Sequence, residues 1–186
     1  GCVLIAGTGS ICYGKNAAGE HFRCGGGGHI IDDPGSGYAL GRDALAAALQ
    51  TEDGRLSENA LHGAVMDTVG GSGIQGIFDF VYFSRRGKGD IAALAPLVLR
   101  CAAQGDAVSL DILRRGAAEL ARLVSAVMGK LGLENGSPCA LAGGLLAEDN
   151  VYRRAVCAAL APFCRPAAPE HDALFGAVQL ALAAIQ

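Results

Sequence analysis

Short apolar segments separated by glycine-rich polar segments dominate the first forty residues of the chain. Residues 2–6 are continuously apolar, and two further strand-like segments, 11–13 and 20–23, flank the polar segment 15–19. Segments of this length, bounded by glycine and asparagine, are typical of β-strands joined by hairpin turns. We therefore predict that the chain begins with three short antiparallel strands, the first of them buried.

After residue 36 the apolar positions recur every three or four residues, which is the period of amphipathic helices. Ser36 is placed to cap a helix that carries Leu45 and Leu49 and that ends at Asp53-Gly54. Residues 57–69 predict a second, shorter helix that ends in a glycine-rich segment, 70–73.

The middle of the chain contains its clearest helical pattern. Residues 74–90 mix aromatic side chains with glycine and charge, and we assign no element to them. Residues 90–104 predict a helix in which Pro96 is tolerable only within about the first turn. Asp106 caps a long helix that ends at Gly132 and has one apolar face. The residues of that face are Leu110, Leu113, Ala117, Leu120, Val124, Val127 and Leu131.

The last third of the chain predicts one more buried strand between helices. The strand covers 139–142 and leads into Gly143-Gly144, and a helix follows over 150–163. Pro166 and Pro169 are then expected to break the chain. A final helix begins at Asp172, with its apolar positions at Leu174, Val178, Ala181 and Ile185.

This order of elements predicts an α/β domain with a mixed sheet and flanking helices. No internal repeat or low-complexity linker divides residues 1–186, so we expect a single domain. The chain opens directly on the buried segment 2–6, and domains rarely begin inside a core strand. We therefore expect further residues upstream of Gly1.

Composition restricts the classes of function. The chain has 186 residues, is 51% hydrophobic and carries a net charge of −3, which argues against a nucleic-acid-binding protein. It contains no run of about 18 apolar residues, so we expect no membrane span. Its seven cysteines include no Cys-x-x-Cys pair. That spacing favours reduced, mostly buried thiols in a cytoplasmic protein over a disulfide framework or a zinc site.

The first glycine-rich turn, Gly7-Thr8-Gly9-Ser10, lies between two predicted strands. P-loops and dinucleotide fingerprints place their glycines ahead of a helix, so this turn is neither. Its backbone N–H groups and the Thr8 hydroxyl suit the terminal phosphates of a nucleotide, as in a hairpin phosphate loop. An ordinary tight β-turn is the alternative.

A second glycine run, Gly25–Gly28, precedes His29 and Asp33. Four consecutive glycines are unfavourable in helices and in strands, so we expect a ligand or another backbone segment to approach closely there. Asp33 lies just before a helix N-terminus, where it would stay ionised and accept a hydrogen bond from a sugar hydroxyl. A plain capping aspartate is the alternative. Cys24 and His29 flank the run, but two ligands are too few for a metal site.

A third glycine pair, Gly143-Gly144, follows a buried strand and precedes a helical region. A turn of this kind lets the backbone lie flat against a planar ligand such as adenine. It is equally a plain connection from strand to helix, and the residues alone leave both interpretations open.

Together these segments resemble the BadF/BadG/BcrA/BcrD ATPase family. Val3–Gly14 looks like the second phosphate motif of that family, and Gly25–Tyr38 resembles its Gly-Gly-Trp-Gly-His…Gly-Asp-Glu-Gly-Ser segment. The similarity spans essentially the whole chain in the right order. It continues through Ala92–Ala95, Ala103–Asp106, Leu141–Gly144 and Phe175–Ala181.

The resemblance implies an actin/hexokinase-type fold of two ribonuclease H-like lobes that close over ATP and a sugar, with this chain as the C-terminal lobe. The ATP-binding residues would be Thr8, Gly9, Ser10, Ala92, Gly143 and Gly144. The sugar-facing residues would be Gly26, Gly27, Gly28 and Asp33. The catalytic base and the first phosphate loop would lie in an N-terminal lobe that these residues do not include, and Mg²⁺ would accompany ATP. The resemblance leaves a homodimer open.

Two residues depart from the family pattern. Gly27 stands where the family usually has Trp, and Pro34 stands where it has Glu. The resemblance implies an ATP-dependent kinase of an amino sugar or a related sugar. An activating ATPase of a radical acyl-CoA dehydratase or reductase is one alternative, and a non-catalytic regulator that binds a nucleotide or a sugar is another.

Overall fold

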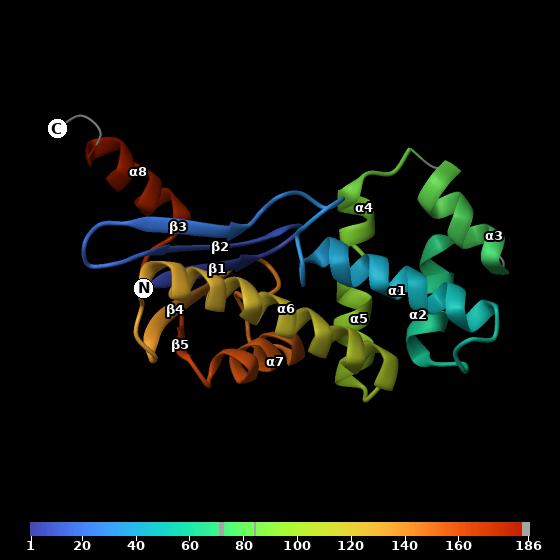
Figure 1. Cartoon of the computed structure of the whole chain (residues 1–186). Helices are drawn as coiled ribbons and strands as arrows, with labels where there is room; N and C mark the ends of the chain where they lie inside the picture. Colours follow the sequence, from blue (N-terminus) through green and yellow to red (C-terminus); the bar gives the residue numbers. More distant parts are fainter. Residues whose placement is uncertain (71–72, 84, 184–186) are drawn as a thin grey trace.

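A five-stranded mixed sheet forms the centre of the protein in the computed structural model, which describes residues 1–70, 73–83 and 85–183 (Figure 1). The order of the strands across the sheet is β3-β2-β1-β4-β5. The strands are β1 (Cys2–Ala6), β2 (Ser10–Lys15), β3 (His21–Gly25), β4 (Ser137–Ala142) and β5 (Cys164–Ala167).

The pairing of the strands gathers the glycine-rich segments at one edge of the sheet. β1 pairs antiparallel with β2 and parallel with β4, and Ile5 is in register with Ala142. Because β1 and β4 run in the same direction, their carboxyl ends meet at this edge. β2 pairs antiparallel with β3, and Ile11 is in register with Gly25, so β3 also ends there.

Two groups of helices lie next to the sheet. Figure 1 shows α6 and α7 along one face of the sheet and α1 to α5 beyond its glycine-rich edge. Among the described residues no single helix is long and apolar enough to cross a membrane. The helical segments Lys88–Ala103 and Ala107–Leu131 reach the required length and hydropathy only when taken together, and the chain bends by 118° between them. The helices are α1 (Gly37–Glu52), α2 (Ala60–Val69), α3 (Gly73–Phe78), the π-helical turn η1 (Asp79–Phe83), α4 (Lys88–Ala92), α5 (Ala95–Ala103), α6 (Ala107–Leu131), α7 (Val151–Leu160) and α8 (Ala173–Ala183).

The long helix α6 packs on the sheet with the predicted face. Leu110 is the exception, because 41% of its surface is exposed. The other six predicted residues, from Leu113 to Leu131, are buried. Asp106 and Gly132 cap α6 as expected. All seven cysteines are unpaired, and the buried ones are Cys12, Cys101, Cys139 and Cys164.

Proline does not end the sheet where the sequence suggested. The prediction that Pro166 breaks the chain was wrong, because Pro166 lies within β5 and is in register with Cys139. β5 is at the edge of the sheet, where a residue without an N–H group is tolerated on the unpaired side. The sheet therefore has one more strand than predicted.

The predicted helix over 90–104 is divided in two. α4 ends at Ala92, and α5 begins again at Ala95 with Pro96 in its first turn, where a missing N–H group costs nothing. The unassigned segment before it contains α3, η1 and the start of α4. The predicted end of the 57–69 helix is confirmed at Gly70; Gly71 and Ser72 lie outside the described residues.

The face of the sheet away from α6 and α7 is open. Ile5 and Tyr13 are 40% and 43% exposed on it. A cavity of about 770 Å³ lies between this face and the segment that leads into α8. α8 forms as predicted, but Leu174 and Val178 are exposed instead of buried, and Ile185 lies outside the described residues.

Candidate functional site

The turn between β1 and β2 forms the centre of the candidate site. The N–H group of Gly7 donates to the carbonyl oxygen of Gly9 at 2.9 Å, which closes the turn. Thr8 at its tip is exposed, whereas Ser10 is buried at the start of β2. The turn therefore presents a hydroxyl group between two glycines at the glycine-rich edge of the sheet.

The N-terminus of α1 folds back onto this turn. Ser36 caps α1 through its side chain, as predicted. The N–H groups of Gly37 and Tyr38 donate to the carbonyl oxygens of Gly7 at 2.7 Å and Thr8 at 3.2 Å. The positive end of the helix dipole therefore lies against the turn, where it favours a bound anion.

Gly143 and Gly144 lie beside the same turn. The N–H group of Leu145 donates to the carbonyl oxygen of Ala6 at 3.1 Å. Gly143 has a φ of +89°, and a Cβ atom built there would overlap the Ala6 carbonyl group, so the close approach requires glycine. Gly144 has open space in its Cβ direction. The parallel pairing of β1 and β4 thus brings this glycine pair next to Gly7.

Ala92, the last residue of α4, packs against the N-terminal half of α1. A Cβ atom built on Gly37 would lie 3.5 Å from the Cβ atom of Ala92. A Cβ atom on Gly41 would overlap the carbonyl oxygen of Ile91, so α1 and α4 approach each other through glycine. Ala92 therefore lies over the same helix N-terminus that contacts the turn.

The second glycine run leaves β3 as a compact loop. Gly26 and Gly28 have φ values of +73° and +94°, in the left-handed region that favours glycine. The N–H group of Gly27 donates to Oδ2 of Asp32 at 2.8 Å. The N–H group of Asp32 donates in turn to the carbonyl oxygen of Gly28 at 2.8 Å, so two hydrogen bonds close the loop.

Asp33 links this loop to the first turn. Asp33 is 4% exposed, and its Oδ1 atom accepts a hydrogen bond from the Ser10 N–H group at 3.2 Å. Its φ of +57° is a conformation that Asp and Asn tolerate better than most residues. The N–H groups of Gly37 and Tyr38 donate to the turn, so the backbone donor that the carboxylate of Asp33 meets is the Ser10 N–H group of β2.

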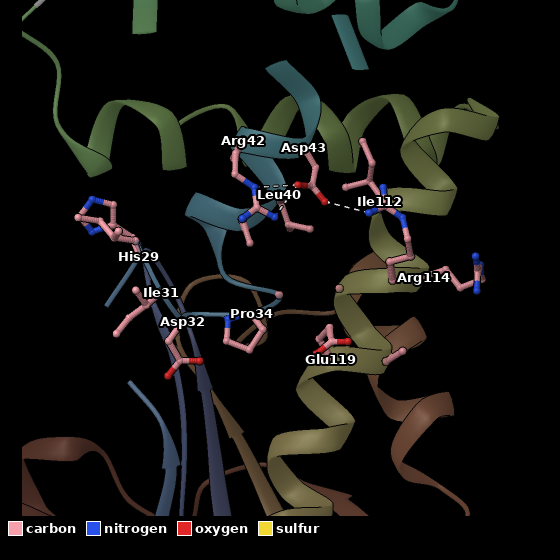
Figure 2. A pocket seen from close by; sticks show the side chains of 16 residues that line it. His29, Ile31, Asp32, Pro34, Leu40, Arg42, Asp43, Ile112, Arg114 and Glu119 are labelled. Carbon is pink, nitrogen blue, oxygen red and sulfur yellow. Dashed lines mark hydrogen bonds and ion pairs between the residues drawn. The ribbon is translucent and has the colours of Figure 1, made fainter. Parts of the chain in front are cut away.

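A cavity of about 600 Å³ opens beside the loop (Figure 2). The segment His29–Gly35, the first half of α1 and part of α6 line it. Figure 2 shows Asp32 and Arg42 on different sides of the cavity. The guanidinium groups of Arg42 and Arg115 lie 2.8 and 3.1 Å from Asp43. The sequence pattern did not indicate this cavity, because its walls come from segments far apart in the chain.

A buried tyrosine holds the backbone beneath the cavity. Tyr152 of α7 is fully buried, and its hydroxyl group donates to the carbonyl oxygen of Gly35 at 2.7 Å. Burial raises the pKa of Tyr152, so the phenol stays protonated and remains a donor. Sequence reasoning missed this contact, because nothing in the local pattern of α7 relates Tyr152 to Gly35.

The ring of His29 packs edge-on against Tyr38, with 4.8 Å between the ring centroids. This contact accounts for the imidazole that the sequence places next to the second glycine run.

Within the described part of the chain, no group of three or more His, Cys, Asp or Glu side chains is placed to hold a metal ion. The carboxylate that lies against the first turn is that of Asp33.

Comparison with known proteins identifies the family. Residues 1–181 match the BadF/BadG/BcrA/BcrD ATPase family. The chain belongs to this family. The match covers all three glycine-rich segments and extends into α8, so it includes every residue for which the sequence implied a role.

Two curated relatives in the comparison are sugar kinases. The N-acetylmuramic acid/N-acetylglucosamine kinase of Clostridium acetobutylicum is 41% identical over 135 residues, which are 73% of this chain and 44% of that protein. The N-acetyl-D-glucosamine kinase of Dictyostelium discoideum is 31% identical over 159 residues, which are 84% of this chain and 48% of that protein. This member of the BadF/BadG/BcrA/BcrD family therefore spans about half the length of the curated relatives it matches.

Solved structures confirm the predicted fold. A protein named as an N-acetylglucosamine kinase from Chromobacterium violaceum has a TM-score of 0.77 at 32% identity, over 97% of this chain and 59% of that one. A second, from Porphyromonas gingivalis, has a TM-score of 0.69 at 18% identity, over 96% of this chain and 59% of that one, and shows the fold alone. The mixed sheet with flanking helices is the ribonuclease H-like, actin/hexokinase-type ATPase fold.

Proposed function

We propose that this chain is the C-terminal lobe of an ATP-dependent kinase that phosphorylates an amino sugar or a related sugar. The convergence of the Gly7–Ser10 turn, Gly143-Gly144 and Ala92 at one edge of the sheet carries the proposal. The names of the two relatives, at 41% and 31% identity, support it. N-acetylglucosamine and N-acetylmuramic acid, the sugars in those names, are the first substrates to test.

In this proposal the first turn binds the terminal phosphates of ATP. The exposed Thr8 hydroxyl and the backbone of Gly9 would approach phosphate oxygens, and the N-terminus of α1 would add positive potential behind them. Ser10 would support the turn from below, because its N–H group donates to Asp33. Gly144, which has open space in its Cβ direction, faces the adenosine, and Ala92 flanks it. Phosphoryl transfer depends mainly on positioning and on neutralising charge, which this arrangement supplies.

Mg²⁺ would reach this site as part of the substrate MgATP. In nucleotide sites Mg²⁺ is held by phosphate oxygens, by waters and by one or two carboxylates. It therefore does not need a cluster of three protein ligands, which the described residues do not form.

The second glycine run and Asp33 would face the sugar, and a preceding lobe would supply the catalytic base. Two observations support a second lobe. The curated relatives are about twice as long as the chain, which covers 44% and 48% of them. The open sheet face and α8 also expose apolar side chains, among them Ile5 and Phe175, that a neighbouring lobe would bury.

A phosphoryl-transfer assay on the complete two-lobed protein tests the function. The panel contains glucose, glucosamine, N-acetylglucosamine and N-acetylmuramic acid, and the readouts are ADP and sugar phosphate. We expect one sugar phosphate per ADP with an amino sugar. The 186-residue chain assayed alone should transfer no phosphate, because it lacks the base.

The same assay separates the alternatives. ATP hydrolysis that is independent of every sugar would favour an activating ATPase. Binding of ATP and sugar by the complete protein without transfer would favour a regulator. Sugar phosphorylation by the isolated 186 residues would contradict the assignment of the base to another lobe.

A further inference from the structure

Gly27 and Asp32 compete for one space on the loop that follows β3. A Cβ atom built on Gly27 would lie 2.9 Å from Oδ2 and 3.0 Å from Cβ of Asp32. Oδ2 could move by a rotation of the side chain, but Cβ is fixed to the backbone. In this loop conformation, therefore, only one of the two positions carries a side chain without a shift of the backbone.

The backbone of Gly27 does not itself require glycine. Gly26 and Gly28 on either side have positive φ values, whereas Gly27 does not. A residue with a side chain would fit the backbone at position 27. The side chain of Asp32 is what excludes it.

The carboxylate of Asp32 is held in place and still has acceptor capacity. Oδ2 accepts the Gly27 N–H at 2.8 Å, which orients the group. Asp32 is only half-buried, and it lines the cavity of about 600 Å³ shown in Figure 2. A carboxylate has about four lone-pair positions, so one hydrogen bond leaves it able to accept others.

We propose that Asp32 determines substrate specificity by accepting a hydrogen bond directly from the sugar, in the place that a side chain at position 27 would otherwise occupy. This inference rests on the proposed function and specifies its substrate class. The family segment that this loop resembles usually has Trp at position 27, so this chain places a charged acceptor where an aromatic side chain is usual.

The charge of Asp32 selects among amino sugars. A carboxylate accepts from hydroxyl and amide N–H groups and repels a negatively charged substituent. The nearby arginines already have carboxylate partners: Arg42 pairs with Asp43, and Arg115 pairs with both Asp43 and Asp111. The substrate class is therefore an uncharged amino sugar such as N-acetylglucosamine, in preference to N-acetylmuramic acid, which carries a carboxylate.

Kinetics of the complete protein test the contact. Asp32→Asn keeps the shape and an oxygen for the Gly27 N–H but removes the charge. We expect KM for N-acetylglucosamine to rise about tenfold while KM for ATP stays unchanged. The kcat/KM for N-acetylmuramic acid relative to N-acetylglucosamine should also rise. Asp53→Asn, at the opposite end of α1, is the matched control and should change neither quantity.

A double-variant cycle tests the competition independently of activity. Gly27→Ala should lower the unfolding temperature of the complete protein, and Asp32→Gly in the same chain should reverse most of that loss. Additive effects of the two substitutions would overturn the competition. A wild-type protein that phosphorylates amino sugars, with an Asp32→Asn variant of unchanged KM and preference, would overturn the specificity role alone. A wild-type protein that phosphorylates no amino sugar would overturn the proposed function and the specificity role with it.

Discussion

The carboxylate of Asp33 accepts a hydrogen bond from the Ser10 N–H group at 3.2 Å, although the two residues lie on different glycine-rich segments. The hydroxyl group of Ser10 also donates to the carbonyl oxygen of Pro34 at 2.7 Å. The loop before α1 therefore cannot shift without moving the turn between β1 and β2. In the proposed kinase, this link couples the position of the sugar to that of the phosphates.

Loss of the Asp33 carboxylate should destabilise the chain. Asp33→Ala leaves the buried Ser10 N–H unpaired, which costs about 1–3 kcal/mol, and puts alanine at a φ of +57°, which costs about 1 kcal/mol more. Asp33→Asn keeps an acceptor oxygen and tolerates this φ, so it should cost under about 1 kcal/mol. Urea unfolding of both variants measures the difference. In the complete protein, Asp33→Asn should raise the sugar KM more than the ATP KM; equal increases would indicate a purely structural role.

Gly143 and Gly144 should respond differently to the same substitution. Gly143→Ala places a methyl group on the Ala6 carbonyl at a φ of +89°, so we expect a loss of about 2 kcal/mol or more in the free energy of unfolding. Gly144→Ala enters open space and should stay within about 0.5 kcal/mol of wild type. Gly144→Val in the complete protein should raise the ATP KM by steric exclusion. Unchanged nucleotide affinity would contradict the placement of adenosine at this residue.

The close contact between α1 and α4 gives a second matched pair. Gly41→Ala would overlap the Ile91 carbonyl group and push α4 away, at a cost of about 1–3 kcal/mol. Gly63→Ala lies in the exposed part of α2 with open space in its Cβ direction, and it should stabilise the chain by about 0.5–1 kcal/mol. Because α4 carries Ala92, Gly41→Ala should also weaken ATP binding in the complete protein. Equal stability of the two variants would be inconsistent with this contact.

Thr8→Ala should separate ligand binding from stability. The Thr8 side chain is exposed, and its backbone carbonyl, which accepts from Tyr38, is unaffected by the substitution. Unfolding should therefore change by less than about 0.5 kcal/mol. If the hydroxyl group contacts a phosphate, ATP use by the complete protein should weaken by about 1–3 kcal/mol. Thr68→Ala on α2 is the control, and an unchanged ATP KM in Thr8→Ala would mean that the threonine is only a turn residue.

Asp106 should make the stability of the chain sensitive to acid. Partial burial alone would raise the pKa of this carboxyl, but the N–H groups of Ser109 at 2.7 Å and Ala60 at 3.0 Å lower it below its ordinary value. A lowered folded pKa stabilises the protein above the unfolded value of about 3.9, and that stability is lost as the pH falls through the folded value. Asp106→Ala should cost about 1–2 kcal/mol at neutral pH. Urea unfolding between about pH 7 and 2 should show the gap to wild type closing below about pH 4; a constant gap would exclude this linkage.

Local signals predicted the elements well because they depend on neighbours within a few residues. Ser36 and Asp106 cap the helices expected of them, and Gly132 ends α6 with a left-handed residue. The periodic face of α6 was predicted because every third or fourth residue meets the same sheet surface. Pro166 misled the prediction, since tolerance of a proline depends on which side of β5 is paired.

Contacts between distant segments decided the site. The sequence by itself determined the fold family, four of the five strands, the principal helices and the three glycine-rich segments. Only the tertiary structure showed that the Asp33 carboxylate accepts from the Ser10 N–H group. It also showed that Gly143 packs on the Ala6 carbonyl group and that the side chain of Asp32 fills the space beside Gly27. The same structure showed that Leu174, Phe175 and Val178 of α8 are exposed, because periodicity predicts that a helix has an apolar face but not what covers it. The physical reason is that strand pairing, which brings these segments to one edge of the sheet, is set by interactions between residues far apart in the chain.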